Sequence, residues 1–248
     1  MKWEHRCSLE WLKERQQYLT ASDVKNLLPI TKTGRKRDVG DAEYLKVMSS
    51  KMVDLTEEDC LSTGVMARGH LLEPYAISVL NSVLGDMGEG MMYHWDDKVV
   101  SVKGRKLAFS PDAMDIPMDG DIADARAIAE VKSYGADKHV ITAFTPKDQI
   151  EERWQIACAM AVLPTIERAY LVLYNPKMRF RKAFIITYDR SDLEDEIAMI
   201  LKVEEDWTDF CERGALTKRP PSGACFSSRG GTEEAIEREI AQRMGLNP

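Results

Sequence analysis

The sequence predicts a mixed α/β fold in which a central mixed sheet is flanked by helices. Segments with apolar residues at helical spacing alternate along the chain with short runs rich in β-branched and aromatic residues. The chain has 248 residues, 44% of them hydrophobic, which is enough to bury a substantial core. No internal repeat interrupts this order, so we expect one domain with appendages.

Two short helices are expected near the amino terminus, at 8–17 and 20–28. Thr20 opens the second helix, and Asp23 three residues later comes close to a capping box. Pro29 closes this helix, because proline has no N–H with which to continue it.

The middle of the chain changes from helix to strands. Residues 62–84 carry apolar side chains at helical spacing, and Pro74 should kink this helix or start a second one. Beyond two glycines the pattern becomes that of strands. The strand-like runs are 91–95, 98–103, 107–110 and 127–133.

The rest of the chain returns to alternating helices and strands. The expected elements are an amphipathic helix at 147–163, strands at 168–174 and 181–188, and a long helix at 191–213. The composition of RPPSGACFSSRGG, at 219–231, is that of a linker. We therefore predict a single domain over 1–218, followed over 219–248 by this linker and a small terminal helix.

Composition excludes several classes of protein. No run approaches the ~20 apolar residues of a membrane-spanning helix, and the segment after Met1 has no signal-peptide core. We therefore expect a cytoplasmic protein with no membrane partner. The five cysteines have neither CxxC spacing nor the density of a disulfide scaffold, so we expect free thiols.

The net charge of −7 argues against a general nucleic-acid coat but is compatible with a local contact to DNA. The distribution of charge is more informative than the sum. The segment TKTGRKR, at 31–37, gathers four cations around a glycine. It is either a solvated loop or a loop that contacts phosphates.

The segment 109–135 places Pro111-Asp112 ahead of Glu130-Val131-Lys132. Side chains alternate along a strand, so Glu130 and Lys132 project from one face while Val131 points away. If the returning hairpin sets Asp112 beside Glu130, two carboxylates and the Val131 carbonyl converge, which suits a hard divalent cation such as Mg²⁺. The ammonium of Lys132 can then orient an attacking water and offset charge that builds on a phosphate.

The order of the motifs carries this inference, because a Glu-x-Lys pair alone is common on exposed strands. Glu73 lies upstream in RGHLLEP, and Gln155 follows on the helix at 147–163. Taken alone, Glu73 could just be a surface residue before a proline. Gln155 could equally be a polar residue on an exposed helix face. A helix glutamate, a strand aspartate, a strand Glu-x-Lys and a helix glutamine in this order are rarely a coincidence.

An acidic segment between the two metal motifs offers rival ligands. They are Asp115, Asp119, Asp121 and Asp124. We interpret this segment as a solvated turn led by Pro117 and Gly120.

With these motifs the chain resembles the PD-(D/E)xK nuclease superfamily, and within it the phage lambda exonuclease-like recombination nucleases. The resemblance extends from Trp11 to Met178. The segments that carry it are Trp11, Arg15 and LTASDV, then ARGHLLEPYA, FSPDAM, AEVKS, WQIACAMAVL and YNPKM. One departure is Ala159, which replaces the tyrosine of the conventional QxxxY pattern after Gln155.

The resemblance implies a restriction-endonuclease-like core and a Mg²⁺-dependent exonuclease. Such an enzyme degrades duplex DNA from its 5′ ends and leaves 3′ single-stranded overhangs for recombination by strand annealing. Asp112, Glu130 and the Val131 carbonyl would hold one Mg²⁺, and Glu73 would help to hold a second, with Mn²⁺ as an alternative ion. Lys132 would handle the nucleophilic water, and Gln155 would hydrogen-bond in the same site.

The resemblance also implies contacts with the end of the DNA. Arg15 and Ser22 would bind the 5′-phosphate, in keeping with the fork geometry of arginine and with a hydroxyl near a helix start. Lys32 and Arg35 would reach the duplex from the basic loop. A ring-shaped homotrimer around the duplex and a single-strand annealing partner are further expectations of the family.

Two other classes remain open. The same metal site would serve a structure-specific or restriction-type endonuclease, and the segment with Arg15 and Ser22 is what favours digestion from an end. A DNA-binding relic without activity is the third class, disfavoured because every expected site residue is present.

Overall fold

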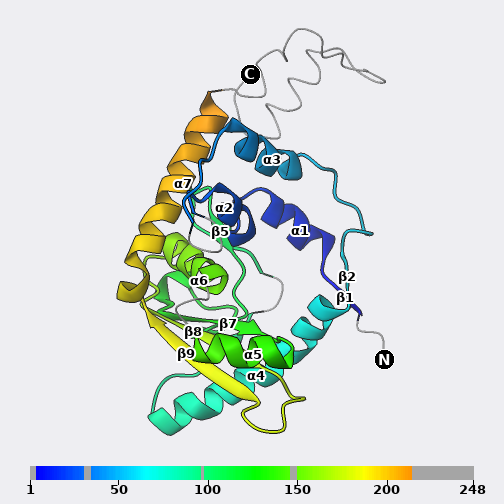
Figure 1. Cartoon of the computed structure of the whole chain (residues 1–248), viewed down its shortest axis with the longest axis vertical. Coiled ribbons are helices and arrows are strands. Elements are labelled where there is room, and N and C mark those ends of the chain that lie inside the picture. The colour runs from blue at the N-terminus through cyan, green and yellow to red at the C-terminus, as the bar shows by residue number, and fades with distance from the viewer. Residues whose placement is uncertain (1–3, 31–34, 96–97, 146–149, 214–248) are drawn as a thin grey trace.

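The structure is a computed structural model of the chain that describes residues 4–30, 35–95, 98–145 and 150–213 (Figure 1). The predicted linker and tail at 219–248 therefore lie outside the described residues. The strands are β1 Glu4–Arg6, β2 Leu61–Thr63, β3 Tyr93–His94, β4 Val100–Ser101, β5 Ala108–Phe109, β6 Ala113–Met114, β7 Ala127–Lys132, β8 Arg168–Tyr174 and β9 Ala183–Asp189. The helices are α1 Leu9–Gln16, α2 Ala21–Leu27, α3 Asp41–Lys51, α4 Val65–Met87, α5 Ala136–Phe144, α6 Ile150–Val162 and α7 Glu194–Glu212, with short 3₁₀ turns at Ile122–Asp124 and Arg190–Leu193.

A five-stranded sheet in the order β3-β6-β7-β8-β9 forms the centre of the fold. β7 and β8 run parallel, with Lys132 opposite Leu173, and the other neighbours are antiparallel. The predicted mixed α/β fold with a central mixed sheet is therefore confirmed.

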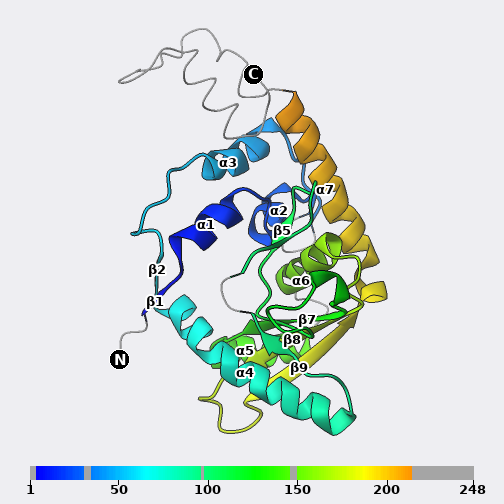
Figure 2. The ribbon, with the colours of Figure 1, turned by 180° about the vertical axis from the view of Figure 1, so that it is seen from behind.

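Both faces of the central strands are covered by helices. On one face, Ala129 and Val131 of β7 pack with Ala76, Ile77 and other residues of α4. On the opposite face lies a larger core that includes α6 and α7, so α4 and α6 enclose the sheet between them (Figures 1 and 2). Burial on both faces explains the nearly uninterrupted apolar run of β8, as is typical of parallel strands.

A short backbone pairing attaches the amino-terminal helices to the rest of the fold. The Leu19 N–H donates to the Lys106 carbonyl at 2.7 Å, and the Ala108 N–H donates to the Leu19 carbonyl at 2.9 Å. Leu19 itself is buried. The connection between α1 and α2 is therefore fixed against the hairpin formed by β4 and β5.

The carboxylate of Glu204 on α7 braces this hairpin. It accepts hydrogen bonds from Arg105 Nε at 2.8 Å, from Lys106 N at 2.6 Å and from Leu107 N at 3.2 Å. One half-buried acid thus satisfies a guanidinium and two backbone donors, all of them next to the residues that hold Leu19.

Several elements match the sequence predictions. Ser8 caps α1 by accepting from Trp11 N at 3.0 Å, and Asp23 accepts from both the backbone and the hydroxyl of Thr20 at 2.8 Å. The strand predicted at 168–174 is β8. Four cysteines in the described ranges are free, as expected.

The prediction for 62–84 was partly wrong. Residues 61–63 form β2 and pair with β1, and α4 begins only after Gly64, whose φ of 68° suits a residue without a side chain. α4 is one continuous helix with Pro74 inside it, so the second helix considered in the prediction does not form. The sequence patterns also missed α3, α5 and β6.

No helix in the described ranges is long and apolar enough to cross a lipid bilayer.

We predict that Glu204→Ala lowers the free energy of unfolding by about 2 to 3 kcal/mol, because it leaves a charged group and two backbone donors without their acceptor. Urea unfolding at constant m-value measures this change. Lys202→Ala is the matched control on the same helix, since Lys202 is 63% exposed and forms ion pairs with its helix neighbours Glu205 and Asp206. The control should stay within about 0.5 kcal/mol of the parent protein, and an equal decrease in both variants would contradict the bracing role of Glu204.

Candidate active site

The register between β6 and β7 sets Asp112 beside the Glu-x-Lys strand. Ala113 lies opposite Ala129, so the residue before β6 comes opposite Glu130. The Asp112 Oδ2 atom accepts a hydrogen bond from Val131 N at 2.6 Å. The structure therefore brings Asp112 and Glu130 together in the way that the hairpin hypothesis required.

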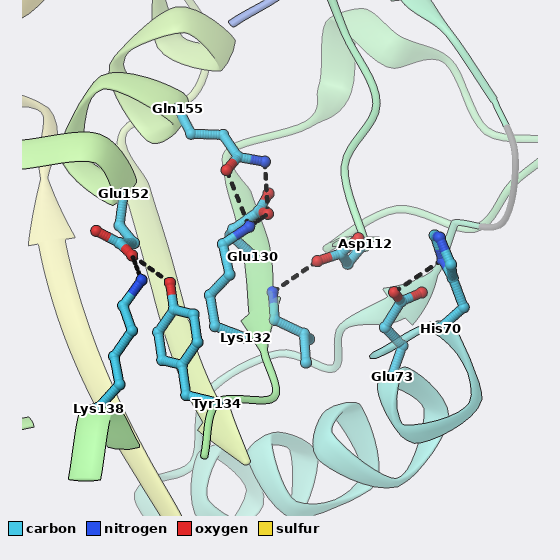
Figure 3. Close-up of polar contacts among 10 residues, drawn as sticks. His70, Glu73, Asp112, Glu130, Lys132, Tyr134, Lys138, Glu152 and Gln155 are labelled. Atoms are coloured by element: carbon cyan, nitrogen blue, oxygen red, sulfur yellow. Dashed lines mark hydrogen bonds and ion pairs between the residues drawn. The ribbon is translucent and has the colours of Figure 1, made fainter. Parts of the chain in front are cut away.

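Glu130, Lys132 and Gln155 form a closed triangle of hydrogen bonds (Figure 3). Lys132 Nζ lies 2.5 Å from Glu130 Oε1 and 2.9 Å from Gln155 Oε1. Gln155 Nε2 donates to Glu130 Oε1 at 2.5 Å. The alternation of β7 sends Glu130 and Lys132 to the same face, where α6 supplies Gln155.

The site contains more negative charge than its single lysine offsets. Burial raises the pKa of Asp112 well above its usual value, and the charges of Glu130 and Glu73 raise it further. Burial by itself lowers the pKa of Lys132, but the carboxylates of Glu130 and Asp112 outweigh that effect and raise it overall. Lys132 is therefore held as a cation among acids.

Glu73 approaches the same site from α4 and is held by two histidines. His70 Nδ1 lies 3.1 Å from Glu73 Oε1, and His94 Nε2 lies 3.7 Å from Glu73 Oε2. Burial alone would raise the pKa of Glu73, but the hydrogen bond from His70 and the proximity of His94 lower it to about 2. Sequence reasoning missed both histidines, although the spacing of His70 and Glu73 on one helix face was a signal for the first.

A second polar cluster flanks the triangle and was also missed. The Tyr134 hydroxyl donates to Glu152, and Lys138 Nζ lies 3.4 Å from Glu152 Oε1 and 3.8 Å from the centroid of the Tyr134 ring (Figure 3). Glu152 is buried and stands one helical turn before Gln155 on α6. The cluster therefore ties α6 to the segment that follows β7.

One cavity of about 670 Å³ lies between the carboxylate and lysine site and the amino-terminal helices. It is lined by Glu73, Asp112, Glu130, Val131, Lys132 and Gln155, and also by Trp11, Arg15 and Ser22. The Arg15 guanidinium carbon lies 5.0 Å from the centroid of the Trp11 ring. Burial lowers the pKa of Arg15, although the charges of Asp23 and Glu130 act in the opposite direction.

The remaining predicted residues lie elsewhere. Lys32 falls outside the described residues, and Arg35 is exposed and is not among the residues that line this cavity. In the acidic segment, Asp121 caps Ala123 N at 2.9 Å and Asp115 accepts from Arg126 N at 3.1 Å. Those two aspartates serve a local turn, and none of the four aspartates lines the cavity.

The donor set around Asp112 fits a hard divalent cation. The available ligands are carboxylate oxygens and the Val131 carbonyl, in a buried site where the charges of Glu130 and Glu73 add to the effect of burial on the pKa of Asp112. Across the described ranges no three acidic, histidine or cysteine side chains converge on a single point. The carboxylates instead accept hydrogen bonds from protein donors, such as Val131 N and Lys132.

No protein-family model and no curated protein sequence matches the chain. Solved structures do match it. The alkaline exonuclease LHK-Exo from Laribacter hongkongensis superposes with a TM-score of 0.55 at 18% identity, over 85% of this chain and 100% of that one. The same exonuclease in complex with dAMP gives a TM-score of 0.53 at 18% identity over the same shares. The chain therefore has the fold of that alkaline exonuclease, in agreement with the family resemblance of its sequence.

Proposed function

We propose that this protein is a Mg²⁺-dependent exonuclease that digests duplex DNA from its 5′ ends and leaves 3′ single-stranded overhangs. The single observation that carries the proposal is the shared cavity, in which Arg15 and Ser22 face the same space as Asp112, Glu130 and Lys132. A metal site alone would serve any phosphodiesterase. An arginine and a hydroxyl beside it add a site for a terminal phosphate, which an endonuclease does not need.

The residues divide the work as follows. Asp112, Glu130 and the Val131 carbonyl would hold one Mg²⁺, and Glu73, kept ionised by His70 and His94, would help to hold a second. When bound, the ion supplies a Lewis acid that lowers the pKa of water and neutralises charge on the phosphate.

Lys132 would act on the reacting groups as a donor, and Gln155 would hold Lys132 in place. The ammonium of Lys132 would orient the attacking water and offset the charge that develops on the phosphate, while Gln155 fixes Lys132 through the contact of 2.9 Å. Trp11 supports Arg15 by packing against its guanidinium, which leaves the donors of Arg15 aimed at a phosphate.

A role in recombination, with a strand-annealing partner and a ring of three chains, belongs to the same proposal and rests on family resemblance. The solved structure of the same fold, an alkaline exonuclease also seen with dAMP, supports the reaction class.

The proposal predicts that the protein digests linear duplex DNA in Mg²⁺ and leaves closed circular duplex intact, because a circle has no terminal phosphate to enter the cavity. Excess EDTA should abolish digestion, and added Mg²⁺ or Mn²⁺ should restore it. Gel analysis of strand-specific labels tells which strand is degraded. Cleavage of the closed circle would assign the protein to the endonucleases instead.

Lys132→Met should slow cleavage by about 10² to 10⁴-fold while binding of duplex DNA in EDTA stays within about twofold, because the lysine serves the chemical step. Single-turnover rates and fluorescence anisotropy measure the two quantities. Lys138→Met is the matched control, since that lysine lies close by but outside the cavity, and it should cut at nearly the parental rate. Near-parental cleavage by Lys132→Met would remove the assignment.

Arg15→Ala should slow digestion of a 5′-phosphorylated duplex far more than that of a 5′-hydroxyl duplex. A charge-assisted contact contributes about 1.5 to 3 kcal/mol, which is about tenfold to over a hundredfold in rate when it is made in the transition state. The measurement compares parent and variant on both ends at one salt concentration. Equal slowing on the two ends would instead indicate a diffuse basic surface.

A further inference from the structure

The loop between β8 and β9 gathers exposed cations around an exposed aromatic ring. Lys177, Arg179, Phe180, Arg181 and Lys182 are all exposed. Arg179 lies 5.4 Å from the centroid of the Phe180 ring, and Phe180 is itself 73% exposed. Phe144 at the end of α5 extends the group, because it is 62% exposed and its ring centroid lies 5.7 Å from the Arg181 guanidinium carbon. We call these six residues the basic-aromatic patch.

The patch carries uncompensated positive charge in a protein whose net charge is −7. Within the described ranges, none of its four cations forms an ion pair with a carboxylate, whereas Arg105, Arg153 and Arg168 each do. A polyanion is the chemical class of partner that such a surface attracts.

The loop is held in place by buried groups. His139, which is fully buried, contacts the Arg181 carbonyl through Nε2 at 3.1 Å. Arg181 has a φ of 52°, a left-handed conformation that costs energy for a residue with a side chain. At the start of the loop, buried Asn175 accepts from Lys177 N at 3.0 Å. The backbone of the loop is therefore anchored near both of its ends.

One of these anchors places the start of the loop beside the segment that follows the Glu-x-Lys motif. Asn175 Nδ2 donates to the Tyr134 carbonyl at 3.0 Å, two residues after Lys132. β7 and β8 are parallel neighbours, so their carboxyl ends lie on the same side of the sheet. The loop therefore begins on the side where the Glu-x-Lys motif ends, next to α5 (Figures 1 and 2).

We propose that the basic-aromatic patch binds single-stranded DNA, namely the strand that the enzyme leaves undigested. Exposed rings flanked by cations can stack unpaired bases while the cations contact the phosphates, but bases inside a duplex present no free face to such rings. This inference rests on the proposed function, because it names what becomes of the product strand.

Anisotropy of a labelled oligothymidine of about 16 nucleotides, in EDTA to prevent cleavage, tests the proposal. Phe180→Ala should weaken binding of this single strand about tenfold, and should leave binding of a blunt duplex within about twofold, because only unpaired bases can stack. Arg179→Ala combined with Lys182→Ala should reduce the slope of log affinity against log salt by about 1.4 for the single strand, which is about 0.7 for each phosphate that the variant no longer neutralises. Lys202→Ala on α7 is the control and should change neither quantity.

Three outcomes would overturn the inference. Patch variants that bind the single strand as the control does would remove the site. If the patch variants weaken binding of the single strand and of the duplex equally, the patch binds the duplex instead. If they change the oligomeric state and leave DNA binding unchanged, the patch is an interface between copies of the chain. Failure of the proposed function gives a different result. In that case the parent protein digests no linear duplex, whether or not the patch binds single-stranded DNA.

Discussion

The pairing of β6 with β7 is the constraint on which the site depends. This pairing is short, yet its register alone decides that Asp112 meets Val131 N and stands opposite Glu130. A slip of β6 by one residue would send every side chain of that strand to the other face of the sheet. The Asp112 side chain would then leave Glu130 and turn toward the apolar contact with α4, where Ala129 and Val131 pack.

Charge is distributed unevenly, and the distribution explains more than the net value. Acidic groups concentrate in the cavity, where burial makes their mutual repulsion costly and favours a bound cation. Cations without ion-pair partners in the described ranges concentrate on the loop after β8. If the protein has the proposed function, its acidic cavity and its basic surface would hold nucleic acid at two places despite the repulsion from its total charge, the first through a bound metal ion.

Local patterns in the sequence were sufficient for some of these features. The cap formed by Thr20 and Asp23 is a short-range signal that the structure confirms. The placement of Glu130 and Lys132 on one face follows from strand geometry alone. β8 was recognisable because burial on both faces leaves a long apolar run. In each case the signal is complete within a short stretch of sequence.

Features that depend on distant segments were not predictable in this way. His94 on β3 reaches Glu73 on α4, and Glu152 meets Tyr134 only because α6 packs against β7. The burial of His139 on α5 depends on its contact with the Arg181 carbonyl, some forty residues later. A local pattern could not indicate this contact, and α5 was missed. β6 is too short to show an alternation, so its existence became visible only through its partner strand.

The contact between Asp112 and Val131 N also explains the proline that precedes the aspartate. Continuing the register of β6 would place Pro111 opposite Val131 in the next hydrogen-bonded pair. Proline has no N–H, so it can offer nothing to the Val131 carbonyl, and the ladder ends there. The carboxylate of the next residue takes the Val131 N–H, while the carbonyl lacks the donor that any other residue at 111 would supply. A single missing hydrogen thus ends a strand and, in the same place, leaves a backbone oxygen free for the metal ion of the proposed function.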